Sequence, residues 1–256
     1  MSAMRFASIG SGSQGNGALV EKGGTCILVD CGFSVAETEQ RLARLGRRPE
    51  NITAIVITHE HGDHVSGAGP LVKKYGLPVW ATAGTAQHRW LRNLPGLRRF
   101  SSHKPFEIGD LQVQPFPVPH DAREPTHFVF SDGARRLGML TDIGRSMPHI
   151  EQHLTGCDAL MLESNYDIDM LANGEYSKKL KQRVGGPYGH LSNIQAAELL
   201  EQLDCSRLQH LVAAHLSAKN NTPDLARAAL SRAMGCEPDW IAIAEQDSGL
   251  AWRDIL

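Results

Sequence analysis

A short segment that follows an apolar run concentrates four side chains able to bind metal ions. They are His59, His61, Asp63 and His64, which lie within six consecutive positions. Imidazole nitrogens and carboxylate oxygens are ligands that suit zinc, manganese or iron. A solvated surface loop seldom collects three histidines and an aspartate directly after a buried strand, so we expect these side chains to face one metal-binding cavity.

Three later residues occupy similar positions, just past apolar strands: His120, Asp142 and His215. They matter because a segment of six residues cannot complete the coordination of two metal ions alone. Taken singly, each would be interpreted as a packing, surface or turn residue, but their common context favours a shared site. The sequence therefore predicts one site of seven ligands. Six other histidines occupy no motif position and are interpreted as structural or surface residues: His88, His103, His127, His149, His153 and His210.

Short strands and helices alternate along the chain and must position these ligands. Alternating or β-branched runs predict strands at 5–9, 19–20, 26–30, 52–57, 79–81, 159–162 and 208–213, and hairpins at 106–116 and 128–140. Helical spacing predicts helices at 36–45, 65–75, 84–94, 147–154 and 193–203, with a last helix starting at Thr222-Pro223. Two mixed α/β halves of this kind indicate an αββα sandwich, with two sheets packed face to face and helices outside. We expect a single domain over residues 1–256.

The ligand pattern resembles the metallo-β-lactamase superfamily, whose His-x-His-x-Asp-His signature is met by residues 59–64. The family's later histidine, aspartate and histidine map in order onto His120, Asp142 and His215. The resemblance implies one metal held by His59, His61 and His120, a second held by Asp63, His64 and His215, and Asp142 between them. Two such cations can hold a bridging hydroxide as nucleophile, which suits hydrolysis of phosphodiesters. The bridging position holds Asp142, whereas many β-lactam-hydrolysing members have a cysteine there. We therefore do not expect antibiotic hydrolysis.

Smaller motifs resemble the YycJ/WalJ-like exonuclease branch of that superfamily. They stand at 10–16, 119–122, 141–144, 163–165 and 189–193. The resemblance covers nearly the whole chain and implies a 5′-to-3′ exonuclease acting on double-stranded DNA. We expect Asp63 and His190 to be the catalytic residues, with a role only in the entry to the following helix as the alternative for His190. His190 precedes a predicted helix N-terminus and is expected to donate a proton to the leaving oxygen.

Substrate contacts are expected from five residues of these motifs: Ser11, Ser13, Asn165, Ser192 and Asn193. The glycine-serine segment at 10–16 can present backbone and hydroxyl donors to phosphate oxygens. It can equally form a tight structural turn. Glu163 and Asn165 end a strand near the expected metal edge, so they can instead orient metal ligands through hydrogen bonds.

Composition narrows the class of protein. The chain has 256 residues, of which 41% are hydrophobic and 21% charged, as in ordinary globular proteins. Its five cysteines are scattered and its start carries no apolar leader, so we expect a cytoplasmic protein with no membrane segment. No obligate protein partner is evident. The net charge of −2 gives no direct argument for nucleic-acid binding, although basic residues cluster at 41–48, 89–99 and 178–183.

The sequence leaves several alternatives open. The same site could serve a small-molecule thioesterase or lactonase, because the nucleophile would also attack a carbonyl. A regulatory protein that binds metal and nucleic acid without turnover is a third alternative. Nitrogen and oxygen ligands accept Zn²⁺, Mn²⁺ or iron, so the identity of the two divalent ions is open as well.

Overall fold

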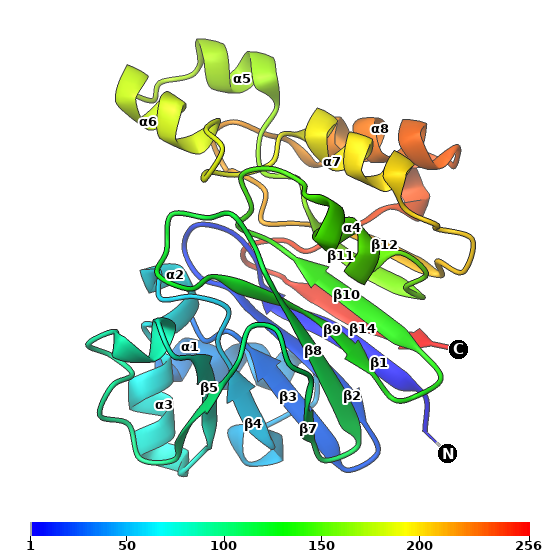
Figure 1. The fold of residues 1–256 in the computed structure, drawn as a ribbon. Helices are drawn as coiled ribbons and strands as arrows, with labels where there is room; N and C mark the ends of the chain where they lie inside the picture. Colours follow the sequence, from blue (N-terminus) through cyan, green and yellow to red (C-terminus); the bar gives the residue numbers. More distant parts are fainter. Residues whose placement is uncertain (1) are drawn as a thin grey trace.

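Two seven-stranded mixed sheets form the centre of the molecule in the computed structural model, which describes residues 2–256 (Figure 1). The first sheet runs in the order β14 (Leu250–Ile255), β1 (Met4–Gly10), β2 (Gly17–Lys22), β3 (Thr25–Val29), β4 (Ala54–Val56), β5 (Val79–Thr82) and β6 (Leu97–Phe100). The second runs in the order β13 (Ala242–Ile243), β12 (His210–Ala214), β11 (Ala159–Glu163), β10 (Arg136–Leu140), β9 (Thr126–Ser131), β8 (Leu111–Pro117) and β7 (Phe106–Ile108).

Helices join and cover these strands. The α-helices are α1 (Val35–Arg44), α2 (Gly62–Val65), α3 (Ala68–Tyr75), α4 (Pro148–Leu154), α5 (Ile168–Asn173), α6 (Lys178–Val184), α7 (Asn193–Gln202) and α8 (Pro223–Met234). Three short 3₁₀ helices are η1 (Pro49–Asn51), η2 (Thr85–Gln87) and η3 (Pro238–Trp240). No helix among residues 2–256 is long and apolar enough to cross a bilayer.

Alternation of side chains along the strands explains the layers. In β3, Ile27 and Val29 belong to the core between the sheets, whereas Cys26 and Leu28 pack on the opposite face under α1 and α3. The outer face of the second sheet is covered in the same way by α4, α7 and α8. Both faces of the central strands of each sheet are therefore buried, and the prediction of an αββα sandwich is confirmed.

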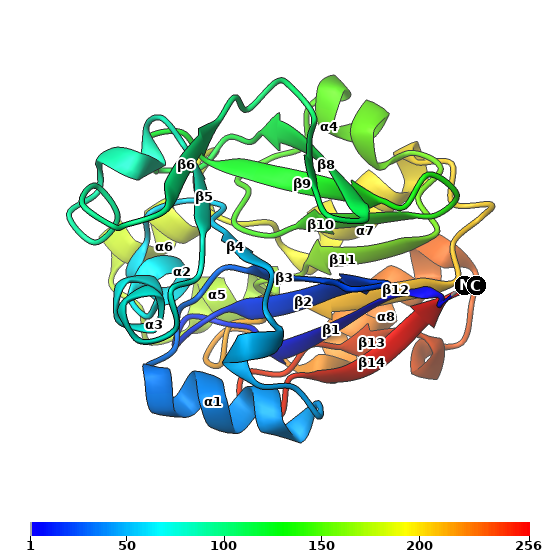
Figure 2. The same ribbon diagram turned by 90° about the horizontal axis from the view of Figure 1, so that it is seen from below.

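Each sheet joins an antiparallel half to a parallel half. Strands β14, β1, β2 and β3 pair antiparallel and β3 to β6 parallel, while β7 to β10 pair antiparallel and β10 to β13 parallel. The first and last strands of the chain lie side by side, because β1 pairs with β14 (Figure 2). The loops after β4, β8, β10 and β12 carry the predicted ligands.

Two predicted helices differ from the structure, and one strand was not predicted. The helix expected at 84–94 is wrong: only η2 forms there, followed by turns as far as Pro95. The helix expected at 65–75 is divided, since α2 ends at Val65 and α3 starts at Ala68. Gly67, between them, keeps helical backbone angles, but its N–H donates to the carbonyl of Cys31 at 2.8 Å instead of to a helical partner, so the helical hydrogen bonding is interrupted there. Strand β6, which is rich in arginine and mostly exposed, was not predicted.

Candidate metal centre

Strand ends bring the seven predicted ligands together. His59 follows β4, His120 follows β8, Asp142 follows β10 and His215 follows β12 directly. The remaining three lie at α2, where His61 is the N-cap residue and Asp63 and His64 are in the helix. All seven therefore reach one region from four separate loops.

The backbone at this region is held in an unusual conformation. Asp142, His215 and a neighbouring residue, Asp30, have φ angles of 50°, 55° and 61°, and they are the only non-glycine residues with positive φ in the described chain, 2–256. The left-handed region costs an L-residue about 1 kcal/mol or more, so it persists only where the surrounding structure enforces it. Such strain concentrates at functional sites.

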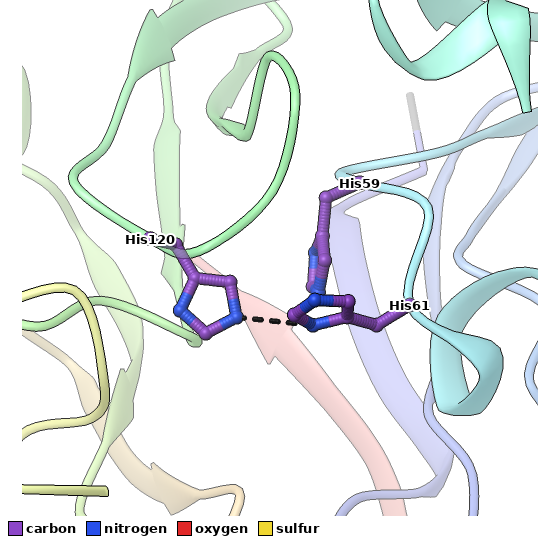
Figure 3. Close-up of side chains that lie close together, drawn as sticks. All are labelled: His59, His61 and His120. Atoms are coloured by element: carbon purple, nitrogen blue, oxygen red, sulfur yellow. Dashed lines mark hydrogen bonds between the residues drawn. The ribbon is translucent and has the colours of Figure 1, made fainter. Parts of the chain in front are cut away.

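His59, His61 and His120 form the first cluster (Figure 3). Their ring centroids are 4.6 Å (His59 to His61), 5.0 Å (His59 to His120) and 4.9 Å (His61 to His120) apart. The Nε2 atom of His120 lies 3.2 Å from Nδ1 of His61. Each ring offers one nitrogen to a common point, with these atoms within 4.8 Å of one another.

Asp63, His64 and His215 form the second cluster. An Asp63 carboxylate oxygen lies 3.4 Å from His64 Nε2 and 3.6 Å from His215 Nε2. Asp142 lies between the two clusters, because its carboxylate oxygens are 3.1 Å from His64 Nε2, 3.5 Å from His215 Nε2 and 3.9 Å from His120 Nε2. Such paired His/Asp clusters are typical of a dinuclear metal site.

Hydrogen bonds on the outer side of the rings leave the inner nitrogens available. His59 Nδ1 lies 3.0 Å from Thr58 Oγ1, and His64 Nδ1 lies 2.8 Å from an Asp30 carboxylate oxygen. His120 Nδ1 donates to the backbone carbonyl of Gly189 at 3.0 Å. Partners of this kind fix the orientation of a metal-binding imidazole.

The other two histidines are held in the same manner. His215 Nδ1 lies 3.1 Å from Asn165 Nδ2, which also donates to the His215 carbonyl at 2.8 Å. His61 is reversed, because its Nε2 lies 3.2 Å from the Asp121 carbonyl and its Nδ1 faces the cluster. Every inner nitrogen is thus turned toward the centre.

Unpartnered polar atoms indicate that the centre fits cations. Within residues 2–256, the buried atoms His59 Nε2, Asp142 Oδ2 and His215 Nε2 have no hydrogen-bond partner. The Asp142 Oδ2 atom is near His64 Nε2 but without hydrogen-bond geometry. Leaving such groups buried and unpaired is costly, and divalent cations would satisfy all three at once. The donor set therefore fits two metal ions.

Burial and charge act differently on the pKa values within this centre. Desolvation, with repulsion from neighbouring imidazoles, lowers the pKa of His59 well below its ordinary value. For His64, burial also lowers the pKa, but the carboxylates of Asp142, Asp63 and Asp30 overcome it and raise the pKa well above the ordinary value. The centre holds excess negative charge near His64, which favours a bound cation there.

Glu163 and His190 adjoin the clusters as a pair. A Glu163 carboxylate oxygen lies 2.8 Å from His190 Nδ1 and accepts a hydrogen bond from the backbone N–H of Asp142 at 2.9 Å. His190 Nδ1 is also 3.5 Å from the Asp142 carboxylate. Burial lowers the pKa of His190, but the neighbouring Glu163 and Asp142 carboxylates give a net rise. The two carboxylates therefore favour the protonated form of this imidazole.

Comparison with known proteins agrees with this geometry. Residues 25–215 match the family described as the β-lactamase superfamily domain. The chain belongs to the metallo-β-lactamase superfamily. Exodeoxyribonuclease YycJ of Bacillus anthracis is 34% identical over 235 residues, which cover 90% of this chain and 89% of the relative. Exodeoxyribonuclease WalJ of Streptococcus pneumoniae is 33% identical over 228 residues, covering 87% of this chain and 85% of the relative.

Solved structures agree on the fold of this metallo-β-lactamase superfamily member. The metallo-β-lactamase fold protein YhfI from Bacillus subtilis superimposes with a TM-score of 0.76 at 18% identity, covering 98% of this chain and 99% of that protein. The chain is thus a metallo-hydrolase related to the YycJ and WalJ exodeoxyribonucleases, with buried His/Asp clusters suited to metal ions.

The five residues expected to contact substrate divide into two kinds. Ser13 is exposed, whereas Ser11, Asn165, Ser192 and Asn193 are buried and engaged within the fold. Ser11 Oγ accepts from the backbone N–H of His215 at 2.9 Å. Ser192 Oγ caps α7, and the amide oxygen of Asn193 accepts from the Ser164 hydroxyl at 2.6 Å. The side chains of the four buried residues form hydrogen bonds within the protein, and these bonds hold the loops that carry the metal ligands.

Asp30 is a site residue that we did not predict. It accepts hydrogen bonds from the Thr58 backbone N–H at 2.9 Å and hydroxyl at 2.8 Å, besides its contact with His64. The available signal was its position, a carboxylate at the end of the apolar strand β3. Strand β3 pairs parallel with β4, and parallel neighbours end at the same edge of a sheet, so Asp30 had to lie near the segment after β4.

Proposed function

We propose that the protein is a metal-dependent phosphodiesterase that hydrolyses nucleic acid, as a 5′-to-3′ exonuclease on double-stranded DNA. The observation that carries the proposal is the Glu163–His190 contact of 2.8 Å beside the metal-ligand clusters. Hydrolysis of a phosphodiester expels a poor alkoxide leaving group, which needs a proton donor. YycJ and WalJ, which align over nearly all of this chain, are named exodeoxyribonucleases and support DNA as the substrate.

In this proposal His59, His61 and His120 would hold one cation, Asp63, His64 and His215 would hold the other, and Asp142 lies between the two clusters. Two divalent ions, Zn²⁺ or Mn²⁺, would supply Lewis acidity toward the phosphate and an activated water. The protein contributes the positions of these ligands. Their outer hydrogen bonds to Asp30, Thr58, Gly189 and Asn165 fix the rings before substrate arrives.

His190 is the proposed general acid. Its Nδ1 is occupied by Glu163, so Nε2 is the nitrogen that can deliver a proton to the departing oxygen. Glu163 also accepts from the backbone N–H of Asp142 and of Leu191, both at 2.9 Å. It therefore couples the position of the acid to that of the ligand shared between the clusters.

A cleavage assay tests the proposal. Purified protein with Mn²⁺ or Zn²⁺ is incubated with duplex DNA labelled at either the 5′ or the 3′ end, alongside the Asp63→Ala variant. A 5′-to-3′ exonuclease releases the 5′ label first as mononucleotides and leaves 3′-labelled fragments that shorten with time. Retention of full-length duplex, or equal cleavage by Asp63→Ala, would overturn the proposal. Hydrolysis of a thioester or lactone without DNA cleavage would identify a small-molecule hydrolase instead.

A further inference from the structure

Arg183 lies at the edge of the metal centre and outside every motif that we used to predict the site. It belongs to α6 and makes a forked contact with Asp121, with Nε 2.7 Å and Nη2 3.2 Å from the two carboxylate oxygens. The Arg183 side chain nevertheless remains 56% exposed. Within residues 2–256, its third nitrogen, Nη1, has no hydrogen-bond partner. One edge of the guanidinium is therefore fixed while the other is free to bind an anion.

Asp121 connects this arginine to the candidate ligands. The carboxylate oxygen Oδ1 lies 3.6 Å from His61 Nε2 and 3.5 Å from His120 Nε2. The backbone N–H of Asp121 donates to the Tyr188 carbonyl at 3.1 Å, which ties it to the loop that carries His190. Asp121 thus stands between Arg183 and the first histidine cluster. The guanidinium lies one side chain outside the reacting centre.

Helix α6 has the character of a surface that binds a polyanion. None of its residues is buried, and it carries Lys178, Lys179 and Lys181 besides Arg183. Figure 1 shows α5 and α6 set apart from the two sheets and joined to them by loops. The chain as a whole has a net charge of −2, so the positive potential of α6 comes from this local cluster and not from the overall charge.

We propose that Arg183, oriented by Asp121, binds the backbone phosphate next to the scissile phosphate of the nucleic-acid substrate. The inference rests on the proposed function. Asp121 separates Arg183 from the metal centre, so the guanidinium is placed to bind a phosphate next to the reacting phosphate and not the reacting phosphate itself. An arginine can bridge a carboxylate and a phosphate through its two edges, so substrate binding does not require the ion pair with Asp121 to break. Asp121 is a positioning residue in this arrangement.

Kinetics on two substrates test this role. Duplex DNA offers a neighbouring phosphate, whereas bis(p-nitrophenyl) phosphate is a diester without one. For Arg183→Ala we expect KM for DNA to rise about tenfold or more, since a hydrogen bond to a charged group is lost, with kcat changed by less than about threefold. The slope of log KM against log salt concentration should fall by about one. Hydrolysis of the small diester should be unchanged. Arg183→Lys should keep most of the salt slope but recover KM only in part.

Arg207→Ala is the matched control. Arg207 is also half exposed and also makes a forked contact with an aspartate, Asp158, at 2.9 Å, but it lies outside the site. The Arg207→Ala variant removes one positive charge, as Arg183→Ala does, and should keep the wild-type KM, kcat and salt slope for DNA.

Three results would overturn the inference. Wild-type KM and salt slope in Arg183→Ala would show that no phosphate is bound there. Equal losses on DNA and the small diester would show that Arg183 acts through the fold or the metal centre. If the wild-type protein does not cleave DNA at all, the proposed function fails and this inference with it, whereas DNA cleavage that is indifferent to Arg183 overturns the inference alone.

Discussion

An Asp30 carboxylate oxygen lies 2.8 Å from Nδ1 of His64, and both side chains are buried. Asp30 also accepts from the hydroxyl of Thr58, which in turn contacts His59 Nδ1 at 3.0 Å. One carboxylate therefore orients a histidine from each cluster. Because outer partners of this kind set the orientation and basicity of metal ligands, Asp30 should control metal affinity without contacting the metal.

Asp30→Asn should weaken metal binding about 10- to 100-fold, as measured by competition with a chromogenic chelator. Asparagine tolerates the left-handed backbone that Asp30 adopts, so the effect reports the lost charge rather than backbone strain. Asp132→Asn is the control, because Asp132 is ion-paired with Lys22 at the β9–β10 turn, away from the metal centre. Equal metal affinity in Asp30→Asn and the wild type would contradict this role.

Gly32 supports the metal loop by its lack of a side chain. A β-carbon at this position would lie 1.8 Å from the backbone oxygen of Asp63. Gly32→Ala should therefore displace α2, with loss of activity and metal content, even though alanine is small and apolar. Gly24→Ala introduces the same methyl group where no atom lies within 4 Å and should leave both properties intact. Assays of hydrolysis and bound metal on the two variants distinguish a steric effect at the loop from a general effect of alanine.

The metal-ligand pattern was predictable because its chemistry is local. Four potential ligands within 59–64 indicate a metal site. The later three ligands can be predicted as the His and Asp residues that follow apolar strands. Asp30 follows the same rule, but a single aspartate after a strand is also an ordinary turn residue. Only the pairing of β3 with β4 makes its position informative.

Other features depend on three-dimensional packing that spacing does not encode. Residues 84–94 have helical spacing, yet the chain turns repeatedly there because Trp90 packs beside Gly62 and the Gly84 N–H donates to Glu124 at 2.7 Å. The Arg183–Asp121 contact joins residues 62 positions apart and leaves no mark in the sequence. Ser11 lies in the glycine-serine loop from which we predicted phosphate contacts. In the structure its buried hydroxyl instead accepts a hydrogen bond from the backbone N–H of His215.

Removal of metal should destabilise the fold as well as abolish activity. Without cations, His59 Nε2, Asp142 Oδ2 and His215 Nε2 are buried and unpartnered, so binding to the folded state is strongly favoured. At a metal concentration 100 times Kd, the stabilisation is about 2.7 kcal/mol per site, or a rise in Tm of several degrees. Thermal unfolding with and without a chelator measures it. The chelator should leave the Tm of a His59→Ala, His215→Ala double variant almost unchanged, and an identical shift in that variant would contradict metal binding at this site.

The loss of kcat on replacing His190 should be larger for substrates whose leaving group must be protonated. His190→Ala is expected to reduce kcat for DNA about 10²- to 10⁴-fold, the usual contribution of a general acid. With bis(p-nitrophenyl) phosphate the loss should be much smaller, because p-nitrophenolate leaves without protonation. Glu163→Gln should show the same substrate dependence to a lesser degree, since it removes the carboxylate that raises the pKa of His190. Equal losses on both substrates would indicate that His190 supports the metal centre instead.

His127 should make stability depend on pH chiefly because its side chain is buried. Its side chain is buried in β9, where desolvation lowers its pKa to about 3 from an ordinary value of 6.5. Between these values the unfolded chain binds a proton that the folded chain excludes, so this contribution to stability is complete above pH 6.5 and falls with pH by about 1.4 kcal/mol per unit. His127→Gln removes the difference. Urea unfolding of chelator-treated protein should therefore show that, between pH 7.5 and 5.5, the wild type loses about 1.4 kcal/mol more stability than His127→Gln. The His103→Gln variant, which alters an exposed histidine, should follow the wild type. If His127→Gln loses stability in parallel with the wild type, His127 already carries its proton in the folded protein at pH 5.5.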